Sequence, residues 1–113
     1  MKAAVVSSFG RPPQYGDFPD PDAAEGEVLV EVKAAGLHQI VRAVASGSHY
    51  SSAGTLPLVP GVDGVGRLAD GKRVYFGATR PPYGTFAERT ITRAAVCVPL
   101  PDGLDDVTAA ALA

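Results

Sequence analysis

Few side chains in this 113-residue sequence could carry out chemistry, and the two histidines are the main candidates. An imidazole can act as a general acid or base near neutral pH. His38 and His49 lie eleven positions apart, across an expected helix end, so they need not share a site. His38 fits either a site residue or a partly exposed, backbone-bonded imidazole. His49 and Tyr50 begin a polar loop that either carries binding groups or is simply solvated.

A glycine-rich stretch at 61–66 invites comparison with nucleotide-binding loops. Dinucleotide-binding folds use the order G-x-G-x-x-G between a strand and a helix, where the backbone can approach a pyrophosphate. Gly61, Gly64 and Gly66 give the order G-x-x-G-x-G instead, and a hairpin signal follows at Asp70-Gly71. We therefore expect these glycines to mark bulges or close strand packing.

The single cysteine, Cys97, lies in an apolar run before Pro99. One thiol cannot form an internal disulfide, and one Cys with two His cannot form a cysteine-rich structural zinc site. We expect Cys97 to be a buried thiol that packs as a small hydrophobic group.

Charge and hydropathy limit the partners of the chain. Ten Lys and Arg against twelve Asp and Glu give a net charge of −2, whereas nucleic-acid binders concentrate positive charge. The sequence has no apolar run of about 18 residues, and its start is too short for a secretory signal. We expect a cytoplasmic protein that binds neither nucleic acid nor a membrane.

Hydrophobic periodicity predicts a mainly β domain with small helices. Val28, Val30 and Val32 alternate with Glu31 and Lys33, as in a strand with one wet face. A helical period over 37–46 predicts one short helix. The full set of expected strands is 2–9, 27–34, 61–68, 73–76, 85–92 and 96–98, which favours a compact β-barrel or paired sheets.

The last ten residues predict a second helix, over 104–113. Asp105 and Asp106 lie near its start, where negative charge favours the helix dipole. The sequence shows no glycine cap and no basic last turn, and an isolated helix this short is marginal in water. We expect that the natural polypeptide continues beyond Ala113.

The order and spacing of several motifs resemble the N-terminal half of medium-chain dehydrogenases/reductases. The motifs are Val32-Lys33-Ala34-Ala35-Gly36-Leu37, the stretch from Leu56-Pro57 to Gly66, the Gly84-Thr85-Phe86-Ala87-Glu88 strand, and Val98 to Leu104 with the Ala-rich run that follows. The resemblance implies a partly open GroES-like β-barrel for residues 1–113. It also implies a C-terminal helix that leads to a Rossmann domain absent from this chain.

Departures from the family pattern concern the metal. Zinc-dependent members place a Cys after the Gly that precedes the short helix, and a His-Glu pair after Pro-Gly. This chain has Gly36-Leu37-His38 at the first place and Gly61-Val62-Asp63 at the second. Val62 cannot bind zinc and no Cys is near Leu37. The chain is therefore more similar to the zinc-independent quinone-oxidoreductase branch, and we expect no metal.

The resemblance also implies a reaction and site residues. Members of that branch reduce quinones or conjugated carbonyls with NADPH (or NADH), and an Asn commonly lines the cleft at the place of His38. His38 would hydrogen-bond the developing oxyanion and touch the nicotinamide, Tyr50 would orient the acceptor, and Val62 would line the substrate cleft. A shift of one residue would put His49 in the place of Tyr50.

Two main functions remain open from the sequence, and metal analysis of the purified protein would test a third, that of a zinc alcohol dehydrogenase. In the first, the chain is the substrate-side part of an oxidoreductase, inactive alone because the missing domain binds most of the cofactor, and the full-length protein is a homodimer. In the second, the chain is a stand-alone GroES-like binding or oligomerisation module without catalysis.

Overall fold

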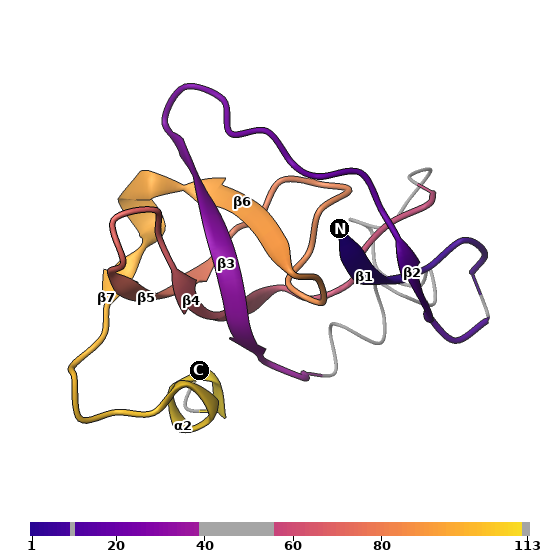
Figure 1. The fold of residues 1–113 in the computed structure, drawn as a ribbon. Helices are drawn as coiled ribbons and strands as arrows, with labels where there is room; N and C mark the ends of the chain where they lie inside the picture. Colours follow the sequence, from indigo (N-terminus) through magenta and orange to yellow (C-terminus); the bar gives the residue numbers. More distant parts are fainter. Residues whose placement is uncertain (10, 39–55, 112–113) are drawn as a thin grey trace.

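The computed structural model describes residues 1–9, 11–38 and 56–111. Within these residues, seven strands form two antiparallel sheets, which lie side by side in Figure 1. The smaller sheet pairs β1 (Lys2–Val5) with β2 (Gln14–Asp17). The larger sheet has the order β6-β3-β4-β5-β7, formed by β3 (Glu27–Ala35), β4 (Asp63–Arg67), β5 (Arg73–Gly77), β6 (Arg89–Arg93) and β7 (Val98–Pro99).

Isolated bridges join the smaller sheet to neighbouring segments and link the end of β5 to β6 within the larger sheet, which gives an open barrel. They pair Ala3 with Ala87, Val6 with Leu58, and Thr79 with Thr92. The predicted fold class, mainly β with an open barrel-like arrangement, is confirmed. No helix of the described residues is both long and apolar enough to cross a membrane.

The alternating pattern of β3 places one face in the core, as predicted. Val30 is completely buried and packs with Val74 and Phe76 of β5, while Glu31 is exposed on the other face. A tight turn joins β4 to β5 at the predicted hairpin. Gly71 has a φ of +88° there, and the Asp70 carboxylate accepts the backbone N–H of Lys72 at 2.9 Å.

The glycines of β4 serve close strand packing, as predicted. A Cβ on Gly64 would meet the carbonyl oxygen of Ala34 at 2.6 Å, and one on Gly66 would collide with the backbone of Glu31. The β3–β4 register also shifts between Val32 and Ala34. Strand β3 therefore runs so close to β4 that only glycine fits at these two positions.

The structure corrects several expected boundaries. The first strand ends at Val5 rather than residue 9, and β6 begins at Arg89 rather than 85, because residues 85–88 form bends and a bridge. The sequence did not predict β2, because prolines lie on both sides of it. Prolines are compatible with an edge strand, and β2 pairs with β1 alone. A 3-10 turn, η2 (Ala94–Val96), precedes β7 in place of part of the expected strand 96–98.

Two further predictions concern Cys97 and the helix over 37–46. Cys97 is half-buried rather than fully buried; it packs beside the Val30 cluster, and burial raises the pKa of its thiol. Most of the predicted helix over 37–46 lies outside the described residues, and Leu37 and His38 are not helical.

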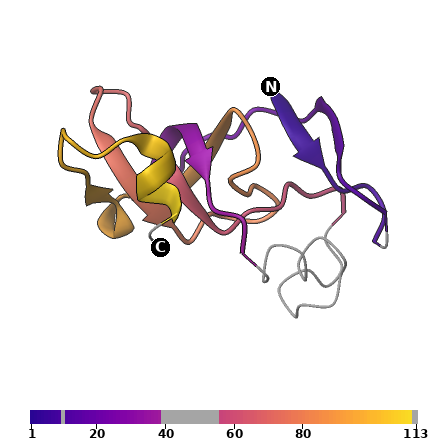
Figure 2. The same cartoon turned by 90° about the horizontal axis from the view of Figure 1, so that it is seen from below.

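The C-terminal helix α2 (Asp106–Ala111) packs beside β3 and β4 (Figures 1 and 2). It starts two residues later than predicted, and the Asp105 carboxylate caps it by accepting the backbone N–H of Thr108 at 3.1 Å. Ala109 and Ala110 are buried against Val65. The Arg73 guanidinium, on β5, holds the Asp106 carboxylate at 2.7 Å, which fixes the helix to the sheet.

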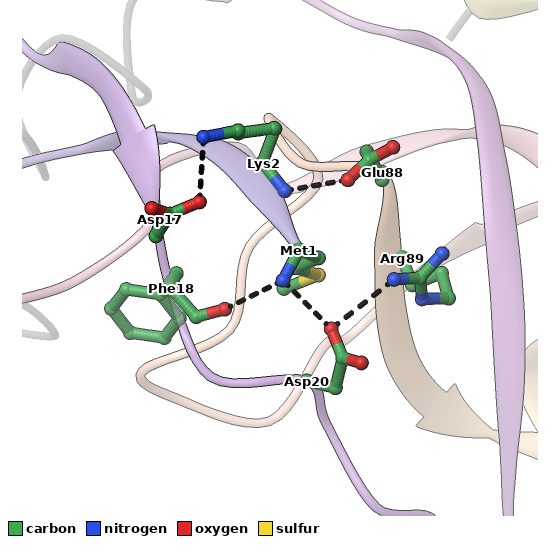
Figure 3. Close-up of polar contacts among 7 residues, drawn as sticks. All are labelled: Met1, Lys2, Asp17, Phe18, Asp20, Glu88 and Arg89. Atoms are coloured by element: carbon green, nitrogen blue, oxygen red, sulfur yellow. Dashed lines mark hydrogen bonds and ion pairs between the residues drawn. The ribbon is translucent and has the colours of Figure 1, made fainter.

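Charged groups also join β1 to its surroundings (Figure 3). The Met1 ammonium donates to the carbonyl oxygen of Phe18 at 3.1 Å and lies 2.9 Å from the Asp20 carboxylate. Asp20 also accepts from Arg89 of β6 at 3.1 Å. We call Met1, Asp20 and Arg89 the N-terminal ion cluster.

Candidate functional site

The first candidate residue of the sequence, His38, lies in a cluster of polar side chains with Asp63 and Tyr75. His38 Nε2 is 3.0 Å from Asp63 Oδ1 and 3.1 Å from Oδ2. The Tyr75 hydroxyl donates to Asp63 Oδ2 at 2.8 Å. We call these three residues the His38 cluster. It joins the loop after β3 to two adjacent strands of the larger sheet.

Strand pairing explains how Tyr75 reaches Asp63. The β4–β5 register sets Asp63 opposite Gly77 and Val65 opposite Tyr75. Asp63 and Val65 share a face because side chains alternate along a strand. Tyr75 is therefore the diagonal neighbour of Asp63, a distance that a long aromatic side chain can span.

Backbone contacts at Gly36 bring His38 to the carboxylate. The Gly36 N–H donates to the Asp63 carbonyl oxygen at 3.2 Å, which ties the end of β3 to the start of β4. A Cβ on Gly36 would collide with both Asp63 Oδ1 and His38 Nε2. The absence of a side chain at this position is what lets the hydrogen bond between His38 and Asp63 form there.

The side chains of the His38 cluster are partly shielded from solvent. The Asp63 side chain is 12% exposed and that of His38 is 32% exposed. Burial, followed by the hydrogen bond to Asp63, raises the pKa of Tyr75 to about 12. The phenol therefore keeps its proton at neutral pH and acts as a donor to the carboxylate.

An apolar pocket lies beside His38. Its other lining residues come from the end of β3, the loop that follows it, and α2: Ala34, Ala35, Gly36, Leu37, Val107, Ala110 and Ala111. Leu37 and Val107 are large apolar side chains that remain exposed, at 74% and 71%. The arrangement places one imidazole at the wall of an otherwise apolar hollow.

Val62 faces a different pocket from His38. That pocket, of about 210 Å³, is formed mainly by Leu58, Val59, Gly61, Ala78 and the segment from Pro81 to Gly84. Val62 comes just before β4, and its pocket shares no lining residue with the pocket beside His38. The sequence placed Val62 and His38 in one cleft, and the described residues do not bring them to one pocket.

His49 and Tyr50 lie outside the described residues. Their assignment to the cleft stays a prediction. The structure instead adds Asp63, Tyr75 and Gly36 to His38. In the sequence, Asp63 stands out only for the family position it occupies. The hairpin turn at 70–71 could have predicted Tyr75 as a partner of Asp63, because it sets residue 65 opposite residue 75. A buried carboxylate also requires hydrogen-bond donors.

The donor set bears on metal binding. Zinc sites use at least three protein ligands from Cys, His, Asp and Glu. Within residues 1–9, 11–38 and 56–111, no group of three or more such residues lies close enough to hold an ion. His38 and Asp63 bond each other, Val62 has no donor atom, and Cys97 contacts the Arg93 carbonyl oxygen at 3.8 Å. The described residues thus do not fit a zinc ion.

The glycines of β4 do not form a dinucleotide-binding loop. Gly64 and Gly66 lie inside β4 against the backbone of β3 rather than at a helix N-terminus. A pyrophosphate needs backbone N–H groups at such a terminus. Because Gly64 and Gly66 pack against β3, their backbone is not open to a pyrophosphate.

Comparison with known proteins places this fold. No family model matches the chain. A curated alcohol dehydrogenase from Geobacillus stearothermophilus is 42% identical over 70 residues, which cover 62% of this chain and 20% of that protein. The quinone oxidoreductase from Thermus thermophilus, whose complex with NADPH is also solved, superposes with a TM-score of 0.81 and 34% identity, covering 94% of this chain and 34% of that one.

A further solved structure, the quinone oxidoreductase from Coxiella burnetii, superposes with a TM-score of 0.86 and 25% identity over 97% of this chain and 40% of that one. These findings confirm the predicted resemblance: the fold is that of the N-terminal, GroES-like part of medium-chain dehydrogenases/reductases. Within that class, these two solved neighbours are quinone oxidoreductases. The chain spans a fifth of the curated relative and about a third of the Thermus enzyme.

Proposed function

We propose that this chain is the substrate-side domain of an NAD(P)H-dependent oxidoreductase that reduces quinones or conjugated carbonyls without zinc. The domain that binds most of the cofactor lies outside residues 1–113. One observation carries the proposal: an imidazole, held by a buried carboxylate, stands at the wall of an apolar pocket. The similarity to quinone oxidoreductases over almost the whole chain supports it.

The chemistry divides between cofactor and protein. The nicotinamide supplies a hydride, which is two electrons and one hydrogen nucleus. The residues of this chain handle the negative charge that develops on the acceptor oxygen. His38 binds that oxygen through a hydrogen bond, which stabilises charge most effectively where water is excluded. Apolar neighbours such as Leu37 and Val107 line the pocket beside His38.

Zinc-independence rests on the ligands themselves. Lewis-acid catalysis would need a third protein ligand at the His38 cluster. Val62, beside Asp63 in the sequence, provides no donor atom, and the Tyr75 hydroxyl already donates a hydrogen bond to the carboxylate. His38 acting as a hydrogen-bond donor therefore replaces a metal ion at the acceptor oxygen.

The test is an assay of NADPH oxidation by the complete protein that contains this chain, against a panel of quinones, enones and simple aldehydes. We expect turnover of quinones or enones, unchanged after dialysis against a zinc chelator. His38→Gln should lower kcat by about 10²-fold or more, as loss of a hydrogen-bond donor to a developing oxyanion does. The matched control Asp70→Asn, in an exposed turn, should leave kcat unchanged.

The isolated 113-residue chain provides the second part of the test. It should neither oxidise NADPH nor bind it tightly in a titration. Turnover by the chain alone would contradict the division into domains, and no turnover of any acceptor by the complete protein would overturn the reaction class. Stoichiometric zinc in the purified complete protein would overturn the zinc-free assignment.

A further inference from the structure

The Asp63 carboxylate receives two side-chain neighbours, and its chemistry decides their roles. An ionised carboxylate accepts hydrogen bonds and cannot donate them. Tyr75 donates its hydroxyl hydrogen to Oδ2. His38 approaches through Nε2, which is nearly equidistant from the two carboxylate oxygens, at 3.0 and 3.1 Å. Nε2 must therefore be the ring nitrogen that carries a hydrogen.

A histidine ring has one remaining nitrogen once Nε2 is fixed. In a neutral imidazole with hydrogen on Nε2, Nδ1 is an acceptor, and in the imidazolium it is a donor. In the part of the chain that the structure describes, Nδ1 has no hydrogen-bond partner. The ring lies at the pocket wall with 32% of its side chain exposed.

The surroundings hold the ring in place. The Gly36 N–H binds the Asp63 carbonyl oxygen, and the space where a Gly36 side chain would be is filled by the carboxylate and Nε2. Raising the pKa of Tyr75 to about 12 keeps its donor proton in place across the neutral range.

We propose that Asp63, itself held by Tyr75, fixes His38 as the Nε2–H tautomer and leaves Nδ1 as the atom that exchanges a proton with the acceptor oxygen. This inference rests on the proposed function and names Asp63 and Tyr75 as positioning residues for it. The acceptor gains a hydride from the nicotinamide and a proton from Nδ1 of the imidazolium. His38 is left as the neutral Nε2–H tautomer and regains a proton from solvent.

The direct test is nitrogen NMR of the histidine rings in the ¹⁵N-labelled 113-residue chain, at a pH where the rings are neutral. His49→Gln assigns the His38 signals, because the sequence has two histidines. We expect Nε2–H to exceed Nδ1–H by about tenfold or more, the ratio that a hydrogen bond to a charged acceptor provides. A ratio near one, or a majority of Nδ1–H, would overturn the inference.

Variants separate positioning from general stability. Asp63→Asn presents an amide that can accept from Nε2 or donate to it, so the tautomer ratio should fall to about threefold or less, or reverse. Tyr75→Phe removes another hydrogen bond to the same carboxylate and should keep Nε2–H dominant. The exposed control Asp70→Asn should leave the ratio unchanged. If Asp63→Asn does not fold, the wild-type and Tyr75→Phe ratios still decide the question.

Kinetics of the complete protein distinguish this inference from the proposed function. Asp63→Asn should lower kcat by about tenfold or more with KM changed less than about threefold, because the interaction acts at the reacting oxygen. Quinone reduction that is unaffected by Asp63→Asn would overturn the positioning role while the proposed function stands. An Nε2–H tautomer in a protein that reduces no acceptor would overturn the function alone.

Discussion

The carboxylates of Asp20 and Asp63 each have two hydrogen-bond partners, and they differ in access to water. Asp20, in the N-terminal ion cluster, is 61% exposed and binds the Met1 ammonium and Arg89 (Figure 3). Asp63, in the His38 cluster, is 12% exposed and binds His38 and Tyr75. The first pair of contacts converges on an exposed carboxylate, and the second converges on a buried carboxylate behind His38, which lines a pocket.

Water determines what each carboxylate contributes. When an exposed ion pair is broken, solvent replaces the lost partner, so such pairs stabilise little and are screened by salt. When a buried acceptor is removed, its donors keep the full cost of lost solvation. Although each carboxylate has two partners, the fold should tolerate the loss of the Asp20 carboxylate and should lose stability when the Asp63 carboxylate is removed.

The largest expected effect is that of removing the buried carboxylate. Asp63→Ala should lower the free energy of unfolding by about 2 kcal/mol, because Tyr75 and His38 lose their acceptor. Urea unfolding of the 113-residue chain measures it. Asp20→Ala is the paired control, and it should change the free energy of unfolding by an amount close to the measurement error. Equal losses at the two positions would contradict the distinction based on water.

Crowding of the His38 cluster should come next. Gly36→Ala adds a Cβ that collides with Asp63 Oδ1 and His38 Nε2, and overpacking of this kind costs about 1–3 kcal/mol. Thermal unfolding provides the measurement. In Gly103→Ala the new Cβ meets no atom within 4 Å, so this variant should melt like the wild type. A stable Gly36→Ala variant would show that the loop carrying His38 moves freely.

Alkaline pH isolates the Tyr75 contribution. The pKa of Tyr75 is raised to about 12 from 10.0, so between these values the unfolded chain has lost a proton that the folded chain keeps. Stability linked to Tyr75 is complete below pH 10 and is lost as the pH rises toward 12. The free energy of unfolding, measured across this pH range, should fall less steeply with pH in Tyr75→Phe than in wild type. Tyr15→Phe, at a residue that is 80% exposed, should follow wild type.

The smallest effect belongs to the N-terminal ion cluster. Hydrogen bonds from the Met1 ammonium and Arg89 lower the pKa of Asp20, so its contribution is present above the ordinary Asp range and is lost as the pH falls. Asp20→Asn should differ slightly from wild type at neutral pH and low salt. The difference should vanish below about pH 3 and in about 1 M NaCl. Persistence in high salt would mean that Asp20 is shielded from solvent.

The sequence predicted those parts of the fold that depend on local patterns. The alternation in β3, the Asp70-Gly71 hairpin and the close packing of Gly64 and Gly66 were all expected and confirmed. The β2 strand was missed because prolines around it obscured a pairing that β1 alone supplies.

The candidate site was harder to predict because its partners come from separate elements. His38 stood out by residue type, but its bond to Asp63 spans 25 positions and depends on the β3–β4 register. Tyr75 reaches the same carboxylate through a diagonal contact that composition and periodicity do not show. Gly36 could be understood only once the neighbouring atoms were in place.

The half-buried thiol of Cys97 can be used to measure local unfolding of the chain. Thiol-reactive dyes attack the thiolate, and burial raises the pKa of this group. Labelling of the native protein should therefore be slow at neutral pH and should accelerate when β7 separates from β5. Because Cys97 is the single cysteine in the sequence, the rate of dye uptake would follow local unfolding at that edge without any engineered label.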